Sequence, residues 1–144
     1  MFDSLLIICT GNICRSPTAE RILRQLLPDK KIDSAGVKAL VGYPADETAL
    51  LTAQHYGVAL DGHKGRQFTK QLGRQYDLIL VMEKRHIESV TRMAPEVRGK
   101  TLLLGHWLQQ KEIPDPYLQS QEAFNFVYQL IDRACQSWAI KLGG

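Results

Sequence analysis

The sequence predicts an α/β protein in three layers, with a four-stranded parallel sheet and helices on both faces. Residues 5–8, and residues 77–82 after the initial Asp77, are continuous apolar runs with the length of strands buried on both faces, and the first is half β-branched. Residues 31–35 and 101–104 are two further strand candidates, and segments with helical periodicity separate the four. Such alternation implies right-handed crossovers, with ligands at the carboxyl ends of the strands.

A loop and a helix follow the first predicted strand. Ser16 and Pro17 are typical of an N-cap and a first helical position. Apolar residues then recur with the spacing of one helix face, at Ala19, Ile22, Leu23, Leu26 and Leu27. The loop from Cys9 to Arg15 therefore joins the end of a strand to the start of a helix. Unpaired N–H groups and the positive end of the helix dipole favour an anion there.

This loop carries the side chains of a site for a tetrahedral oxyanion. Cys9 is a candidate nucleophile, because the helix end and the Arg15 guanidinium both favour its thiolate form. Arg15 also presents a planar fork of donors that matches two phosphate oxygens. Gly11 lets the backbone approach a ligand closely, and Asn12 tolerates left-handed geometry. The pattern predicts a phosphate cradle with a nucleophile at its floor.

The middle of the chain continues the alternation of strands and helices. Asp46 is a candidate N-cap for a helix that Gly57 ends. A short helix is expected over 68–75, and a longer one over 83–93 that Pro95 closes. On the longer helix, the inward positions are expected to be Ile87, Val90 and Met93.

The last helix follows a loop over residues 105–117, where two prolines prevent both a helix and a strand ladder. We expect the helix to begin at Gln119 or Ser120. Trp107 and Phe126 are also expected to pack in the core. The apolar stripe of this helix consists of Phe124, Val127, Tyr128, Ile131, Cys135, Trp138 and Leu142.

Length and composition predict a single domain over residues 1–144, because this length buries a core without disulfides or metal. Three cysteines fit reduced thiols, and no segment resembles a membrane span or a leader peptide. We therefore expect a cytoplasmic monomer without stable membrane association. The net charge of +3 is scattered, so no nucleic-acid partner is expected. Histidines lack ligand spacing to cysteines or carboxylates, and neither a metal site nor a cofactor is expected.

The run CTGNICRSP at residues 9–17 resembles the phosphate-binding loop of the low molecular weight protein tyrosine phosphatases. Ser34-Ala35-Gly36, Gly42-x-Pro44-Ala45-Asp46 and Asp115-Pro116-Tyr117 extend the resemblance over essentially the whole chain. It implies hydrolysis of phosphotyrosine through a cysteinyl-phosphate on Cys9, with Arg15 holding phosphoryl oxygens and Asp115 protonating the leaving phenolate. The remaining members of the implied phosphate-binding loop are Thr10, Gly11, Asn12, Ile13, Cys14 and Ser16.

The resemblance also implies roles for residues outside the loop. Asn12, Ser34 and His63 match a polar network that braces the loop, whereas the residues alone would make Ser34 and His63 ordinary loop residues with satisfied hydrogen bonds. Leu40 and Tyr117 match the walls of the slot that admits the substrate ring.

One departure from the common family pattern concerns the slot. Leu40 and Leu118 stand where many relatives have aromatic residues, and an aliphatic wall stacks less on a phenyl ring. This pattern is similar to the bacterial subgroup associated with capsule and exopolysaccharide synthesis. The implied partner is a membrane-anchored tyrosine autokinase with a phosphotyrosine-rich tail.

Two residues of the loop keep alternative roles. The Ser16 hydroxyl is expected to cap the helix, to donate to the Cys9 sulfur, or both. Cys14 either protects Cys9 from overoxidation by forming a disulfide, as the resemblance implies, or is a small buried hydrophobe.

Three other functions are weighed against a phosphatase. An arsenate reductase of the same fold needs further cysteines downstream, and there is none between Cys14 and Cys135. A phosphoryl-carrier domain has no need of Arg15 or of a general acid. A non-catalytic phosphotyrosine-binding module would bind a phosphopeptide without releasing phosphate. The sequence favours a protein-tyrosine-phosphatase.

Overall fold

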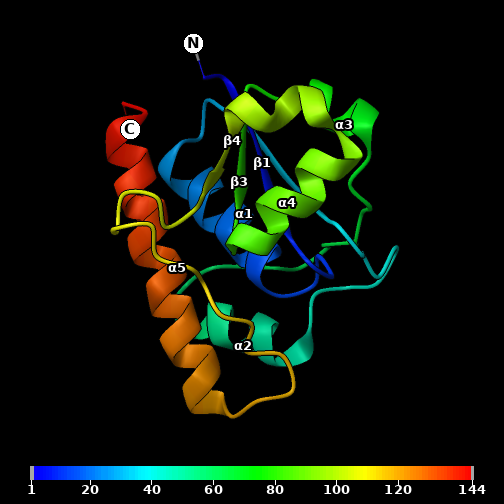
Figure 1. Ribbon diagram of the computed structural model, residues 1–144. Helices are drawn as coiled ribbons and strands as arrows, with labels where there is room; N and C mark the ends of the chain where they lie inside the picture. The colour runs from blue at the N-terminus through cyan, green and yellow to red at the C-terminus, as the bar shows by residue number, and fades with distance from the viewer. Residues whose placement is uncertain (1, 144) are drawn as a thin grey trace.

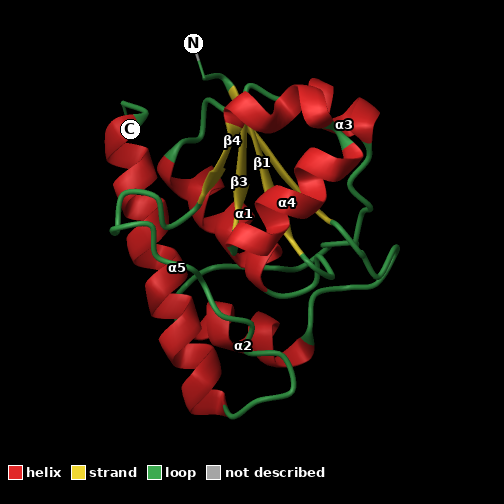
Figure 2. Ribbon diagram, viewed as in Figure 1, coloured by secondary structure: helices red, strands yellow, loops and turns green. Residues whose placement is uncertain are grey.

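The computed structural model describes residues 2–143 and contains a parallel four-stranded sheet with strand order β2-β1-β3-β4 (Figure 2). The strands are β1 (Ser4–Cys9), β2 (Lys31–Gly36), β3 (Leu78–Val81) and β4 (Thr101–Leu103). β1 is central, because Leu5 pairs with Ile32 of β2 on one side and with Leu78 of β3 on the other. The predicted fold class is confirmed.

Helices cover both faces of this sheet. They are α1 (Arg15–Leu26), α2 (Glu47–His55), α3 (Lys70–Arg74), α4 (Lys84–Met93) and α5 (Gln121–Lys141), with a 3₁₀ helix at Pro95–Lys100. Apolar residues of α1, α2 and α5 share one core with one face of the sheet, and those of α3 and α4 share another core with the opposite face. Figure 1 shows α4 in front of the sheet and α1 behind it.

β1 contributes to both cores. Leu5 and Ile7 face α1 and α5, whereas Leu6 and Ile8 face the α3 and α4 side, and all four side chains are fully buried. Full burial of such a side chain contributes about 1.5–3 kcal/mol relative to exposure. The two-sided burial expected from the continuous apolar run is confirmed, and it makes the end of β1 a rigid mount.

The predicted helix starts are confirmed at two places. Asp46 accepts a hydrogen bond from Ala49 N at 3.0 Å, and Ser120 accepts one from Ala123 N at 3.2 Å, so both act as N-caps. Gly57 follows α2 with a positive φ of 82°, a conformation that glycine adopts without strain.

The expected capping role of Ser16 is wrong. α1 begins at Arg15 after Cys14, and no side chain caps it. The Ser16 hydroxyl instead points to the sulfur of Cys9 at 2.9 Å. The N-cap propensity of serine placed Ser16 at the correct end of α1. It did not predict that the Ser16 hydroxyl contacts the sulfur of Cys9 instead of the helix backbone.

Three residues expected inside are exposed. Met93 is the last residue of α4 and is exposed, although Val90 before it and Ala94 after it are buried in the core. Phe126 falls on the solvent side of α5, because the helical period that buries Phe124 and Val127 turns it outward. Trp107 lies in a turn, and its ring packs edge-on against that of Trp138, with 5.5 Å between the ring centroids.

Segments at the carboxyl ends of the strands converge on the β1–α1 loop. The stretch after β2 pairs with the loop backbone, because Lys38 N donates to Thr10 O, Leu40 N to Gly11 O and Asp46 N to Ile13 O. Gly36 is required at this approach, since a Cβ there would lie 2.4 Å from Thr10 O. Among the helices of residues 2–143, none combines the length and apolar character needed to cross a membrane.

Candidate active site

Cys9 is the last residue of β1, and its sulfur is surrounded by donors. The backbone N–H of Asn12 points to Sγ at 3.3 Å. The Ser16 hydroxyl lies 2.9 Å from Sγ and accepts a hydrogen bond from Asn12 Nδ2 at 2.8 Å. Ser16 can therefore direct its own hydrogen at the sulfur. Donors to sulfur stabilise a thiolate more than a thiol.

Asn12 holds the loop in shape with every polar atom of its side chain. Its Nδ2 donates to Ser16 and to Ser34 Oγ, the latter at 3.0 Å, and its Oδ1 accepts from Arg66 N at 2.8 Å. Its backbone oxygen accepts from His63 Nε2 at 2.6 Å, and its φ is 59°. The structure thus brings Ser34 and His63 together around Asn12, behind the loop and outside the pocket. These bonds over-determine a left-handed conformation that is uncommon outside glycine.

Arg15 is buried at 1% exposure, and Glu83 is the carboxylate that hydrogen-bonds its guanidinium. Nη1 donates to Glu83 Oε2 at 2.5 Å and to the backbone oxygen of Ile113 at 2.7 Å. Burial raises the pKa of Glu83, but hydrogen bonds from Arg85 and Arg15 outweigh it and lower the pKa to about 2. Glu83 is therefore a carboxylate at neutral pH and fixes the guanidinium.

Asp115 reaches the same place from the loop before α5. Its Oδ2 lies 3.7 Å from Arg15 Nη2, and its Oδ1 accepts a hydrogen bond from Tyr117 N at 3.0 Å. The side chain is 43% exposed, so it can meet a group that enters from solvent. Residues 9, 15 and 115 are far apart in the chain, yet the fold assembles them at one opening.

These side chains share a pocket of about 240 Å³. Leu40 and Tyr117, the two predicted slot walls, both line it, and Lys38 adds a cation. Ser34, His63, Asn12 and Ser16 do not line it and act on it only through the loop. The full lining consists of Cys9, Thr10, Gly11, Ile13, Cys14, Arg15, Lys38, Leu40, Asp115 and Tyr117.

Sequence reasoning missed Glu83 and His86 at the start of α4. His86 is fully buried, and its Nε2 lies 2.9 Å from Thr10 Oγ1. Glu83 carried a usable signal, because it directly follows a buried parallel strand whose carboxyl end faces the ligand side. No sequence signal pointed to His86, since its partner Thr10 lies 76 residues away in the chain.

We expect His86 to make the folded protein sensitive to mild acid. Burial, together with the positive charges of Arg15 and Arg85, lowers the pKa of His86 to about 4, against about 6.5 in an unfolded chain. Between these values the unfolded chain binds the additional proton, so the free energy of unfolding falls as pH drops from about 6.5 to 4, by up to about 3 kcal/mol. Urea unfolding at pH 7 and pH 4.5 should show this loss.

A His86→Gln variant should lose much of this pH dependence, while His55→Gln, on the exposed side of α2, should keep it. Burial also lowers the pKa of His63, so part of the slope is expected to remain in the His86 variant. Identical slopes for His86→Gln and the wild type would contradict the assignment.

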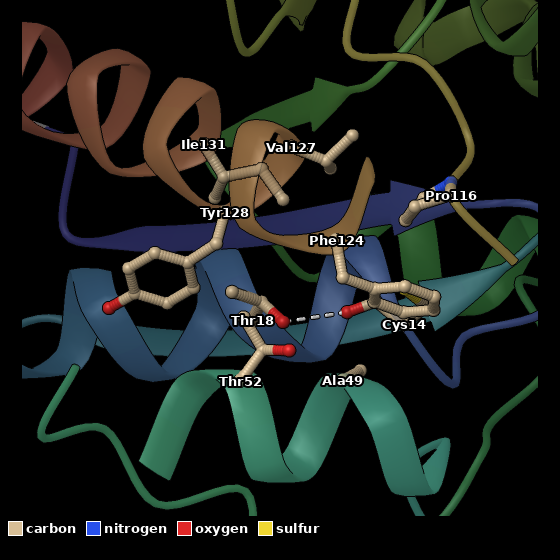
Figure 3. Close-up of a pocket in the computed structure, with 9 residues that line it drawn as sticks. All are labelled: Cys14, Thr18, Ala49, Thr52, Pro116, Phe124, Val127, Tyr128 and Ile131. Atoms are coloured by element: carbon tan, nitrogen blue, oxygen red, sulfur yellow. Dashed lines mark hydrogen bonds between the residues drawn. The ribbon is translucent and has the colours of Figure 1, made fainter. Parts of the chain in front are cut away.

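A second, apolar cavity lies behind the loop, between α1, α2 and α5 (Figure 3). Cys14 touches both cavities, and its backbone oxygen accepts a hydrogen bond from the Thr18 hydroxyl at 2.8 Å. The free volume of about 10 Å³ admits about one water molecule. Burial raises the pKa of the Cys14 thiol well above its usual range, which favours the neutral form.

Within residues 2–143, no three or more histidine, cysteine or acidic side chains are grouped to hold a metal ion. The pocket instead offers a sulfur, a buried guanidinium, a carboxylate and the amides of a helix N-terminus. This set can bind a tetrahedral oxyanion and transfer a phosphoryl group to sulfur.

Comparisons with known proteins identify the family to which the chain belongs. The family model "Low molecular weight phosphotyrosine protein phosphatase" matches residues 4–143. The low molecular weight protein-tyrosine-phosphatase Etp of Escherichia coli K12 is 59% identical over 98% of this chain and 95% of its own, and Wzb of the same strain is 54% identical over 96% and 95%.

Solved structures match over nearly the whole chain. The tyrosine phosphatase Wzb from Escherichia coli K30, in complex with sulphate, has a TM-score of 0.97 and 63% identity over 99% of both chains. Wzb of Vibrio vulnificus, in complex with benzylphosphonate, has a TM-score of 0.96 and 54% identity over 98% of this chain and 99% of its own. The chain therefore belongs to the low molecular weight phosphotyrosine protein phosphatase family and is a protein-tyrosine-phosphatase.

Proposed function

We propose that the chain hydrolyses phosphotyrosine in two displacements through a cysteinyl-phosphate on Cys9. The observation that carries this is the shared pocket of Cys9, Arg15 and Asp115. Relatives with similar structures bind sulphate and benzylphosphonate, ligands that combine a tetrahedral anion with, in the second case, an aromatic ring. The same two parts make up a phosphotyrosine side chain.

In the first step, the Cys9 thiolate attacks phosphorus, and the bond from phosphorus to the tyrosine oxygen breaks. Asp115 gives its proton to the leaving phenolate, while Arg15 and the loop amides hold the phosphoryl oxygens. Asn12 already orients the loop and Glu83 already orients Arg15, so little reorganisation accompanies the change of charge.

In the second step, water attacks the phosphocysteine and the phosphorus–sulfur bond breaks. Asp115 now accepts a proton from the water, and the Ser16 hydroxyl stabilises the departing thiolate from its position 2.9 Å away. Phosphate leaves, and the enzyme returns to its starting state with no cofactor consumed.

Rapid mixing with p-nitrophenyl phosphate tests the intermediate. We expect a burst of p-nitrophenol close to one equivalent per chain, and acid-quenched protein from ³²P-phosphotyrosine peptide should carry label at Cys9. Cys135→Ala should carry the label equally, because Cys135 is buried on α5 away from the pocket. Turnover with neither burst nor label would exclude a covalent step, and arsenate reduction would favour the reductase.

We infer that the protein substrate is the phosphotyrosine-rich tail of a membrane-anchored tyrosine autokinase in exopolysaccharide or capsule synthesis, met by a cytoplasmic, monomeric phosphatase. The aliphatic wall at Leu40 and the similarity to the Wzb proteins support this. Purified enzyme should release phosphate from the phosphorylated tail at least as fast as from unrelated phosphotyrosine peptides. Slower release from the tail would contradict this partner.

A further inference from the structure

The side chain of Thr10 is held by the first turn of α4. Thr10 directly follows the nucleophile and lines the pocket. Its Oγ1 lies 2.9 Å from His86 Nε2 and 3.3 Å from Arg85 Nη2. Arg85 is itself anchored, because its Nε and Nη2 bind the two carboxylate oxygens of Glu83, each at 3.1 Å.

The direction of the hydrogen bond between His86 and Thr10 follows from the other ring nitrogen. His86 Nδ1 lies 3.1 Å from the backbone N–H of Glu83, so Nδ1 is the acceptor in that contact. A neutral imidazole carries one hydrogen, which must then be on Nε2. The low pKa of the buried His86 keeps the ring neutral at physiological pH. Nε2 therefore donates to Thr10.

Thr10 Oγ1 thus accepts two hydrogen bonds, from His86 and from the cation Arg85, and both lone pairs are occupied. Within residues 2–143, the Thr10 hydroxyl makes no hydrogen bond other than these two. Its hydrogen is left for a group that enters the pocket. Donation from a cation and from a ring N–H also polarises the O–H bond and strengthens it as a donor.

We propose that Thr10 donates a hydrogen bond to a phosphoryl oxygen of the bound substrate, and that His86 is the positioning residue that holds this donor. The proposal rests on the phosphate-binding function proposed above. It adds a side-chain donor to the loop amides and Arg15, and it explains the fully buried histidine at the start of α4.

Competitive inhibition by inorganic phosphate, measured with p-nitrophenyl phosphate, tests this donor. Thr10→Val keeps the shape and removes the hydroxyl, and should raise the Ki for phosphate about tenfold or more. Thr10→Ser should restore most of the affinity. Thr91→Val is the matched control on α4, because the buried Thr91 hydroxyl has no hydrogen-bond partner within the described chain, and its Ki should equal that of the wild type.

The role of His86 is tested by a double-mutant cycle. His86→Gln should weaken phosphate binding in the wild-type background but add little in the Thr10→Val background, because the donor it orients is already gone. Fully additive losses would overturn the positioning role.

Alkylation of Cys9 with iodoacetamide distinguishes donation by Thr10 to phosphate from a purely structural role of Thr10 in the loop. The rate without phosphate should be the same in Thr10→Val and the wild type, whereas protection by phosphate should need about ten times more phosphate in the variant. An unchanged Ki, an equal loss in Thr10→Ser, or an altered rate without phosphate would overturn the proposal. If phosphate fails to protect the wild type, the phosphate site itself is wrong.

Discussion

Replacement of Cys9 by serine is expected to reduce phosphate release on the order of 10⁴-fold or more, as when a covalent nucleophile is lost. A serine hydroxyl is not ionised at neutral pH, and the two buried histidines are engaged elsewhere, because His63 binds Asn12 and His86 binds Thr10. The helix N-terminus and Arg15 remain in place. The variant should therefore still bind phosphopeptide and act as a substrate trap.

Parallel assays of phosphate release and peptide binding by wild type, Cys9→Ser and Cys135→Ala provide the measurement. Cys135→Ala removes an equally buried sulfur from α5 and should keep its turnover. A serine variant with a tenth of wild-type activity would show that the sulfur is not the nucleophile.

Replacement of Asp115 by alanine should lower turnover of phenyl phosphate by roughly 10²–10⁴-fold, the range of general acid–base catalysis. The loss should shrink with p-nitrophenyl phosphate, whose leaving group needs less protonation. Asp115 is suited to this dependence because it lies at the open side of the pocket, 3.7 Å from Arg15. Phosphate affinity should change little, because an acid for the leaving group contributes mainly in the transition state.

Asp29→Ala is a matched control for this variant. Asp29 is exposed between α1 and β2, at the edge of the sheet opposite the pocket, so its removal should leave turnover unchanged. Equal losses with both leaving groups would show that Asp115 does not protonate the phenolate.

Local signals predicted the parts of the molecule that depend on a few neighbouring residues. The apolar run after Ser4 gave β1, and the caps at Asp46 and Ser120 placed two helices correctly. Each of these features depends on residues within one turn or one strand, so the local sequence is sufficient to predict it.

Tertiary contacts account for the features that were missed or wrong. Ser16 has the residue type of a cap, but the sulfur of Cys9, brought close by the turn of the loop, takes its hydroxyl. Glu83 balances the charge of the Arg15 guanidinium, which lies 68 positions earlier in the chain. No periodic pattern in the sequence predicts a pairing over such a distance. Trp107 was misplaced because its packing depends on how a turn meets α5.

Burial of Arg15 has a consequence for how the enzyme is made on the ribosome. The groups that compensate its charge, Glu83 and the Ile113 carbonyl, are synthesised 68 and 98 residues after it. A nascent chain that ends before Glu83 would have to bury an uncompensated cation, at a cost of several kcal/mol. Translation therefore completes the phosphate pocket only in its final third, and we expect an amino-terminal fragment that ends before Glu83 to have no formed catalytic centre.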